Sequence, residues 1–149
     1  MKAITNNPFL VSEELAVHRE DLAELHARGI ALGIVTNRCR EETERSLAQL
    51  NLHNLLRVTV SRDDVSSPKP DPEGISLAVT RLGLDPSQVL YFGDSVGDMT
   101  AAKEAGVIPI GVINNTFIWD RIRPVLRNAG AVEVCCLGHF VYSYLYGVC

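Results

Sequence analysis

The segment Val89-Leu90-Tyr91-Phe92-Gly93-Asp94-Ser95-Val96-Gly97-Asp98 is the most informative stretch of this chain, because a short apolar strand runs directly into an acidic turn. Asp98 falls in the first turn of the following helix, four residues after Asp94, so the two carboxylates should lie close together. Mg²⁺ takes one or two carboxylates, keeps several waters and leaves room for a phosphate. The turn is typical of a magnesium site, although an N-cap followed by a first-turn acid explains the same pattern.

Helical and strand patterns alternate on both sides of this segment. The apolar run Ile30-Ala31-Leu32-Gly33-Ile34-Val35 predicts a strand that is covered on both faces and ends at Thr36. The prolines at 68, 70 and 72 predict a loop over 63–72. The remaining patterns predict helices over 12–28, 41–50, 75–82, 96–106 and 117–128, and strands over 55–61, 107–112 and, at an edge, 131–134.

This rhythm predicts the fold class, an α/β Rossmann-like three-layer core with a mainly parallel sheet and helices on both faces. Ligands bind such sheets outside the carboxyl ends of the strands. Thr36, Asp94 and the loop that holds Lys69 should collect there. Each has an alternative explanation, because Thr36 could cap the next helix and Lys69 could be a solvated loop lysine.

Length and composition fit a single domain over residues 1–149. The formal net charge of −4, without any basic run, argues against nucleic acid as a partner and favours a small ligand. No stretch approaches the roughly 20 apolar residues of a membrane span, so we expect no membrane partner and a cytoplasmic location. The spacing of Cys39, Cys135, Cys136 and Cys149 favours free thiols.

Three motifs occur in an order that resembles the haloacid dehalogenase-like (HAD) hydrolases, and most closely their phosphoglycolate phosphatase-like branch. They are Thr36-Asn37 after an apolar strand, Pro68-Lys69-Pro70, and the 93–98 turn followed by a helix to Gly106. The resemblance covers residues 9–134. It implies Mg²⁺-dependent hydrolysis of a small phosphate monoester, with a small phosphorylated metabolite as partner.

The resemblance also implies a role for each motif residue. Thr36 and the groups around Asn37 would hydrogen-bond the transferring phosphoryl group as catalytic and substrate-binding residues. Lys69 would neutralise the charge on the phosphate oxygens. Asp94 would hold Mg²⁺, and Asp98 would support the ion directly or through water.

One element of the family pattern is missing, because no Asp-x-Asp motif precedes Thr36 and the first aspartate is Asp21. The resemblance therefore implies an N-terminally incomplete member without the nucleophile or the cap domain, and we expect this chain alone to have little or no phosphatase activity. The nucleophile strand would be central in the sheet. Residues 2–5 are expected to fill part of the gap; direct pairing of its neighbours, or a strand from another chain, are the alternatives.

Two other functions are compatible with parts of the sequence. One is a non-catalytic protein that binds phosphate and Mg²⁺ or another partner. The second is a serine hydrolase, because Gly93-Asp94-Ser95-Val96-Gly97 fits a nucleophile elbow and Asp120 and His139 follow in the matching order. A dinucleotide site is disfavoured, because Gly93 and Gly97 do not make the required glycine pattern.

Two further expectations concern packing. His18 lies on the apolar face of the helix predicted over 12–28, which favours a buried core histidine. Residues 135–149 are apolar, aromatic and short of charge. This tail either packs across the sheet, forms a subunit contact or results from an altered reading frame, and homo-oligomers could form through it or through the sheet gap.

Overall fold

A computed structural model describes residues 8–12 and 18–147 of the chain. Six parallel strands form one sheet in the order β3-β2-β1-β4-β5-β6. The strands are β1 Phe9–Val11, β2 Leu32–Val35, β3 Val58–Val60, β4 Leu90–Gly93, β5 Ile108–Val112 and β6 Glu133–Cys135. The predicted fold class is confirmed, and the sequence order of the strands reverses at β1, between β2 and β4.

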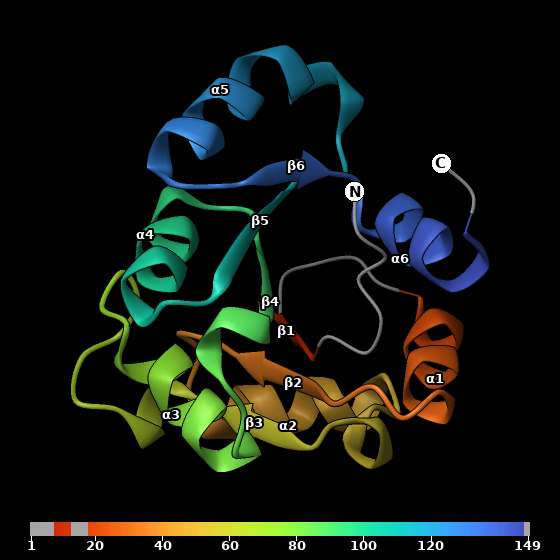
Figure 1. The fold of residues 1–149 in the computed structure, drawn as a ribbon. Coiled ribbons are helices and arrows are strands. Elements are labelled where there is room, and N and C mark those ends of the chain that lie inside the picture. Colours follow the sequence, from red (N-terminus) through yellow and green to blue (C-terminus); the bar gives the residue numbers. More distant parts are fainter. Residues whose placement is uncertain (1–7, 13–17, 148–149) are drawn as a thin grey trace.

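Helices cover both faces of this sheet. They are α1 Arg19–Ala27, α2 Arg40–Gln49, α3 Glu73–Leu82, α4 Val96–Ala105, α5 Trp119–Ala129 and α6 Leu137–Tyr146. Buried residues of α1, α2 and α6 share one hydrophobic cluster, and those of α3, α4 and α5 share the other. Figure 1 shows α3 and α4 on one side of the strands and α1 and α6 on the other. We call these sides the α4 face and the α6 face.

The central position of the sheet is filled by Phe9–Val11, which pairs with both β2 and β4. Residues 2–5, which were expected to fill part of this gap, lie outside the described part of the chain. Direct pairing of β2 with β4 is wrong. Leu10 is fully buried and Phe9 nearly so, which is why this short apolar run can serve as the innermost strand.

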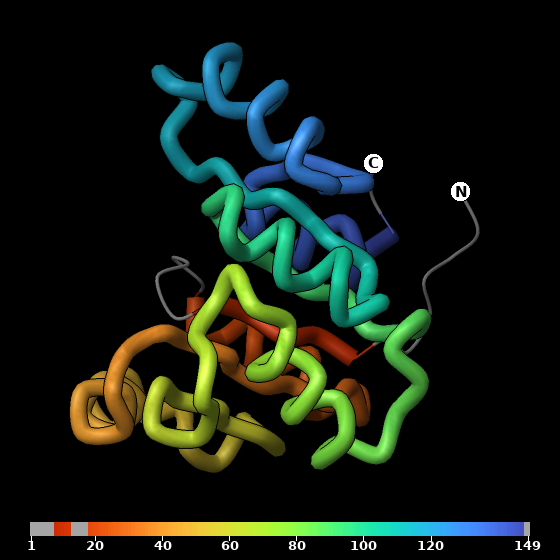
Figure 2. Tube along the Cα trace, turned by 90° about the vertical axis from the view of Figure 1, so that its left-hand side faces the viewer, coloured from red at the N-terminus to blue at the C-terminus, as the bar shows by residue number. Residues whose placement is uncertain are grey.

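The first helix begins later than predicted. Ser12 directly follows β1 and donates its backbone N–H to the Phe92 carbonyl, and α1 begins only at Arg19. Residues 13–17, which the prediction included in the helix, lie outside the described residues. His18 is the N-cap of α1 and is exposed, so the expectation of a buried core histidine is wrong. The tube in Figure 2 traces the whole path, with α3 and α4 in front of the sheet.

The C-terminal tail packs across the sheet, one of the three outcomes considered. Leu137, Val141 and Leu145 of α6 are buried on the α6 face. The rings of Phe140 and Tyr144 lie 6.1 and 5.2 Å from that of Phe9. β6 is the edge strand, as predicted. The sheet gap is thus filled by β1 and the apolar side of α6 is buried, whereas Tyr142 and Tyr146 are exposed on that helix. Oligomerisation stays a prediction.

Candidate functional site

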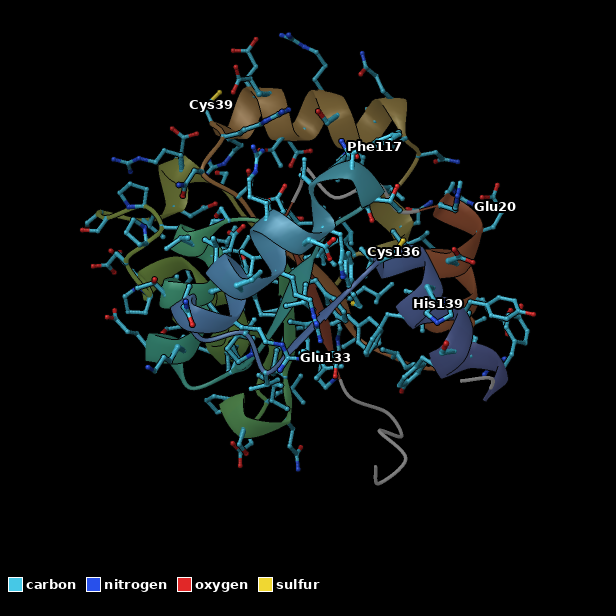
Figure 3. The ribbon with its side chains drawn as sticks, turned by 90° about the horizontal axis from the view of Figure 1, so that it is seen from above. Glu20, Cys39, Phe117, Glu133, Cys136 and His139 are labelled. Carbon is cyan, nitrogen blue, oxygen red and sulfur yellow. The ribbon has the colours of Figure 1, made fainter. Side chains whose placement is uncertain are left out.

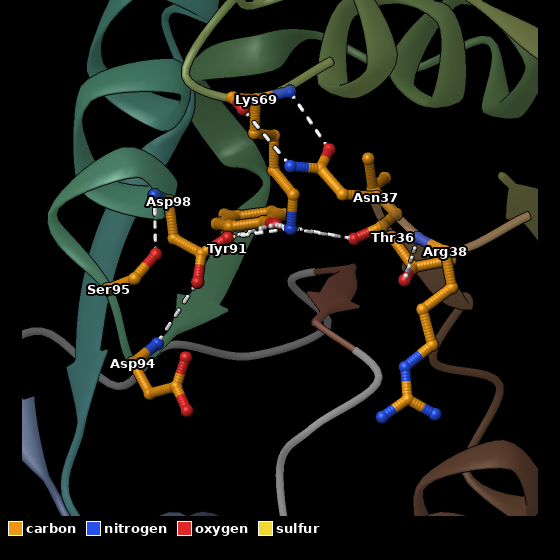
Figure 4. Close-up of polar contacts among 9 residues, drawn as sticks. Thr36, Asn37, Arg38, Lys69, Tyr91, Asp94, Ser95 and Asp98 are labelled. Carbon is orange, nitrogen blue, oxygen red and sulfur yellow. Dashed lines mark hydrogen bonds and ion pairs between the residues drawn. The ribbon is translucent and has the colours of Figure 1, made fainter. Parts of the chain in front are cut away.

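The loops that follow β2 and β4 meet the loop of Lys69 at the carboxyl edge of the sheet (Figure 4). β2 and β4 flank the short β1, so the residues that follow these two strands lie on either side of the sheet centre. Thr36 directly follows β2, and Asp94 directly follows β4. Parallel strands bring such residues to one edge even when they are distant in sequence. The predicted convergence of Thr36, Lys69 and Asp94 is therefore present in the structure.

The Lys69 ammonium group is buried at the centre of this edge. Its side chain is 8% exposed and that of Asp98 is 4% exposed, and Nζ lies 2.6 Å from Asp98 Oδ1. Nζ also donates to the Val35 carbonyl at 3.1 Å and to the Tyr91 hydroxyl at 2.9 Å. Lys69 is therefore not a solvated loop lysine, because a buried ammonium group persists only with such partners.

Asn37 fixes the loop that carries Lys69. Its side-chain Nδ2 donates to the Lys69 carbonyl at 3.0 Å, and its Oδ1 accepts from the Lys69 backbone N–H at 2.9 Å. This two-point contact joins the end of β2 to a loop 32 residues further along the chain. The Asn37 side chain therefore positions Lys69, which sequence reasoning had not foreseen.

Asp98 connects Lys69 to the acidic turn. Its Oδ1 accepts a hydrogen bond from the Lys69 ammonium group, and its Oδ2 accepts one from the Asp94 backbone N–H at 3.2 Å. The turn fits together because residue 93 is glycine: a Cβ there would come within 2.3 Å of the Asp98 Cβ. Ser95, and not Asp94, caps α4 by accepting from the Asp98 N–H at 3.0 Å. The alternative that Asp94 is simply an N-cap is wrong.

Tyr91 is a site residue that the sequence analysis treated only as part of an apolar strand. Its hydroxyl donates to Asp98 Oδ1 at 3.2 Å and accepts from Lys69. Complete burial raises the pKa of Tyr91 well above its ordinary value of 10, and the negative charge of Asp98 adds to this. The hydroxyl therefore stays protonated. The signal available in the sequence was one hydroxyl-bearing ring in a strand otherwise free of polar side chains.

We call Lys69, Tyr91 and Asp98 the lysine cluster.

Thr36 is 6% exposed, and its Oγ1 accepts from the Arg38 backbone N–H at 3.1 Å. The helix that follows has Cys39 as its N-cap, so the alternative that Thr36 caps this helix is wrong. The hydroxyl proton of Thr36 is not used by that contact. In Figure 4 the Arg38 guanidinium and the Asp94 carboxylate extend in the same direction past the strand ends, on either side of the view.

The donor set fits only a cation that needs few protein ligands. No group of three or more His, Cys, Asp or Glu side chains within residues 8–12 and 18–147 is placed to bind a metal ion. Asp94 is exposed at the edge, whereas both oxygens of Asp98 face protein donors. Mg²⁺ suits this arrangement, because one carboxylate, waters and phosphate oxygens can complete its shell.

The residues of the serine hydrolase hypothesis are not assembled. The Ser95 hydroxyl serves as the cap of α4. His139 is exposed on α6 (Figure 3), and no hydrogen bond joins it to Ser95 in the described part of the chain. A nucleophile of this type needs its base within hydrogen-bond reach. The geometry therefore gives no support to a catalytic triad.

Residues 12–112 match the family model of the haloacid dehalogenase-like hydrolases. The chain is 42% identical over 103 residues to the pyrophosphatase PpaX of Bacillus velezensis, covering 69% of this chain and 47% of the relative. It is 40% identical over 93 residues to a phosphoglycolate phosphatase of Salmonella paratyphi A, covering 62% and 37%. A hydrolase structure from Pseudomonas syringae matches with a TM-score of 0.67 and 29% identity, covering 78% and 54%.

The fold and the matched segment together define a Rossmann-like α/β core with a parallel sheet. The chain belongs to the haloacid dehalogenase-like hydrolase family. It spans about half of the length of PpaX and less of the phosphoglycolate phosphatase. The family assignment made from the three motifs is thereby confirmed.

Two composition-based expectations can be compared with the structure. None of the helices in the described part of the chain is both long and apolar enough to cross a bilayer. Cys39, Cys135 and Cys136 are free thiols, as predicted, whereas Cys149 lies outside the described residues.

Proposed function

We propose that this chain binds a small phosphate monoester together with Mg²⁺ at the carboxyl edge of its sheet, as the core of a phosphoglycolate phosphatase-like enzyme. The observation that carries the proposal is the buried lysine cluster, tied to Thr36 through Asn37 and to Asp94 through Asp98. The related proteins named as a pyrophosphatase and a phosphoglycolate phosphatase act on small phosphorylated compounds, which supports this class of ligand.

Each residue has a defined task in this proposal. The Thr36 hydroxyl donates to a phosphoryl oxygen, and the positive charge of Lys69 balances the negative charge on the group. Asp94 binds Mg²⁺, which when bound would neutralise phosphate oxygens. Asp98 supports the ion by holding the Asp94 backbone, and it keeps Lys69 in place. Asn37 holds the Lys69 loop against the end of β2.

We expect this chain by itself to turn over little substrate. In the mechanism that the family resemblance implies, an aspartate carboxylate attacks the phosphoryl group, whereas the residue that follows the central strand β1 here is Ser12. Positioning and charge neutralisation alone leave water as the nucleophile. We therefore expect the purified chain to bind its ligand without turning it over, which corresponds to the non-catalytic alternative.

The test is a thermal shift titration with Mg²⁺ and inorganic phosphate, with an aryl phosphate assay beside it. At about one hundred times Kd, the melting temperature should rise by roughly 5–10 °C. Asp94→Asn should remove the part of the shift that depends on Mg²⁺. Asp120→Asn is the matched control, because Asp120 is also exposed but lies on α5, and it should leave the shift intact.

Two results would contradict the proposal in different ways. Absence of any shift with Mg²⁺ and phosphate in the unmodified chain would exclude the binding site. Rapid Mg²⁺-dependent hydrolysis of an aryl phosphate, lost in Asp94→Ala, would show that the chain is active and that the missing nucleophile has a replacement.

A further inference from the structure

Ser12 carries a buried hydroxyl at the carboxyl end of the central strand. The residue is 7% exposed, and its backbone N–H donates to the Phe92 carbonyl at 3.1 Å. Within the part of the chain that the structure describes, its side-chain hydroxyl has no hydrogen-bond partner. Buried hydroxyl groups are nearly always paired in folded proteins, because an unpaired one costs free energy. This hydroxyl is therefore placed to meet a ligand.

The strand geometry shows which way the Ser12 side chain faces. Phe9 and Val11 belong to the cluster on the α6 face, whereas Leu10 belongs to the cluster on the α4 face. Successive side chains of a strand alternate between faces. Ser12 therefore faces the α4 side, which is the side of Tyr91 and of the lysine cluster.

On that face Ser12 lies next to two residues of the neighbouring strands that contact the lysine cluster. Val11 is aligned with Ile34 and Phe92, so Ser12 lies opposite Val35 and Gly93. The Val35 carbonyl accepts a hydrogen bond from Lys69. The Asp98 side chain covers Gly93 so closely that a Cβ on residue 93 would collide with it. Ser12 thus lies between the two attachment points of the buried ion pair.

The hydrogen-bond inventory of Lys69 explains why a further donor matters. An ammonium group has three N–H donors. The Lys69 ammonium meets three protein acceptors, on Val35, Tyr91 and Asp98. Lys69 can attract a phosphoryl group by its charge, but it has no N–H left to donate unless one of these contacts breaks. Other donors at the same edge, hydroxyl groups among them, are then needed to make the hydrogen bonds.

We infer that the Ser12 hydroxyl donates a hydrogen bond to a phosphoryl oxygen of the bound monoester, beside the lysine cluster. This inference rests on the proposed phosphate site and adds a ligand-binding residue to it. Ser12 lies in none of the three motifs that carried the family resemblance. It acts by binding the anion and takes no part in covalent chemistry.

The test uses Ser12→Ala in the full chain, with inorganic phosphate and Mg²⁺ as the probe. The Kd for phosphate should rise about five- to tenfold, the usual effect of one lost hydrogen bond. The melting temperature without ligand should stay the same or increase, because the substitution removes an unpaired buried hydroxyl. Ser12→Thr, which keeps the hydroxyl, should bind phosphate within about threefold of the unmodified chain.

Ser61→Ala is the matched control. Ser61 is also a buried serine directly after a strand, but its hydroxyl already donates to Asp64 at 2.9 Å. We expect this variant to melt at a lower temperature and to bind phosphate with unchanged Kd.

The outcomes separate the two proposals. If the unmodified chain does not bind phosphate, the proposed function and this inference both fail. If it binds phosphate and Ser12→Ala binds equally well, only the inference about Ser12 fails. A lower melting temperature of Ser12→Ala with unchanged Kd, as in the control, would show a structural role and overturn the inference.

Discussion

The two faces of the sheet bury different chemistry. The α6 face contains a cluster of aromatic rings, in which Phe9 and Phe140 both lie 5.1 Å from Phe92. The α4 face buries a charged pair and a tyrosine hydroxyl at its carboxyl edge. Apolar burial stabilises a fold without further requirements, whereas a buried charge needs a partner for every group. Both faces thus bury an apolar cluster, and the α4 face adds a buried ion pair at the edge where we propose that the ligand binds.

The largest effect should follow from removing one member of the buried pair. Lys69→Met leaves Asp98 as an unpaired buried charge, which we expect to destabilise the chain by about 3–5 kcal/mol and to abolish phosphate binding. The double variant Lys69→Met/Asp98→Asn removes both charges and should regain most of this stability without regaining binding. Urea unfolding and thermal shift titration measure the two properties.

The double variant allows this prediction to be tested even if the single variant does not fold. If the double variant is as unstable as the sum of its single substitutions, the two side chains are not coupled and the ion pair is not the organising contact. If the folded double variant binds phosphate as well as the unmodified chain, the lysine cluster has no part in the ligand site.

A substitution on the α6 face should separate stability from binding. Leu137 is 1% exposed on α6, and Leu137→Ala should cost about 2–5 kcal/mol of unfolding free energy by leaving a cavity. The Kd for phosphate should not change, because the substitution lies on the other side of the sheet. Tyr142→Ala is the control on the same helix; Tyr142 is 52% exposed, so we expect a change below about 1 kcal/mol. Loss of phosphate binding by a folded Leu137→Ala would mean that the faces are coupled.

The sequence predicted the β4–α4 region well because its signals are local. An apolar run gives the strand, Ser95 caps the helix, and Gly106 ends it in the left-handed conformation that glycine favours. These features depend on neighbours within a few residues. The rule that ligands bind at the carboxyl ends of parallel strands supplied the expectation that Thr36, Lys69 and Asp94 collect at one edge, and the family resemblance supplied their roles.

The same reasoning failed where distant contacts decide the structure. Phe9–Val11 is too short to show a period, and the Ser12-Glu13-Glu14 sequence resembles a helix start, so only the pairing with β2 and β4 identifies β1. The recurrence of Leu137, Val141 and Leu145 every four residues could have revealed α6. The partners of Lys69 were beyond the sequence, because Tyr91 and Asp98 lie 22 and 29 residues away.

The smallest predicted effect is on stability and concerns Asp64, a carboxylate that holds a loop of the fold, in contrast to the carboxylates of the proposed site. Asp64 follows β3 and accepts from the Ser61 N–H at 2.8 Å and from Arg40 at 2.7 Å. Burial raises the pKa of Asp64, but these hydrogen bonds and the Arg40 charge outweigh it and hold the pKa below 3.8. The contacts therefore stabilise the fold above about pH 4, and this contribution is lost as the pH falls through the pKa of the folded state.

Asp64→Asn tests this assignment through the pH dependence of stability. At pH 7 the variant should be less stable by about 1 kcal/mol, the usual size of a capping interaction, and the difference should shrink as the pH falls below 4. Phosphate binding at pH 7 should be unchanged, in contrast to Asp94→Asn. Melting curves at a series of pH values give the comparison. A difference that stays constant down to the lowest pH would mean that the ionised form of Asp64 has no special stability, and that neutral hydrogen bonds suffice to hold this loop.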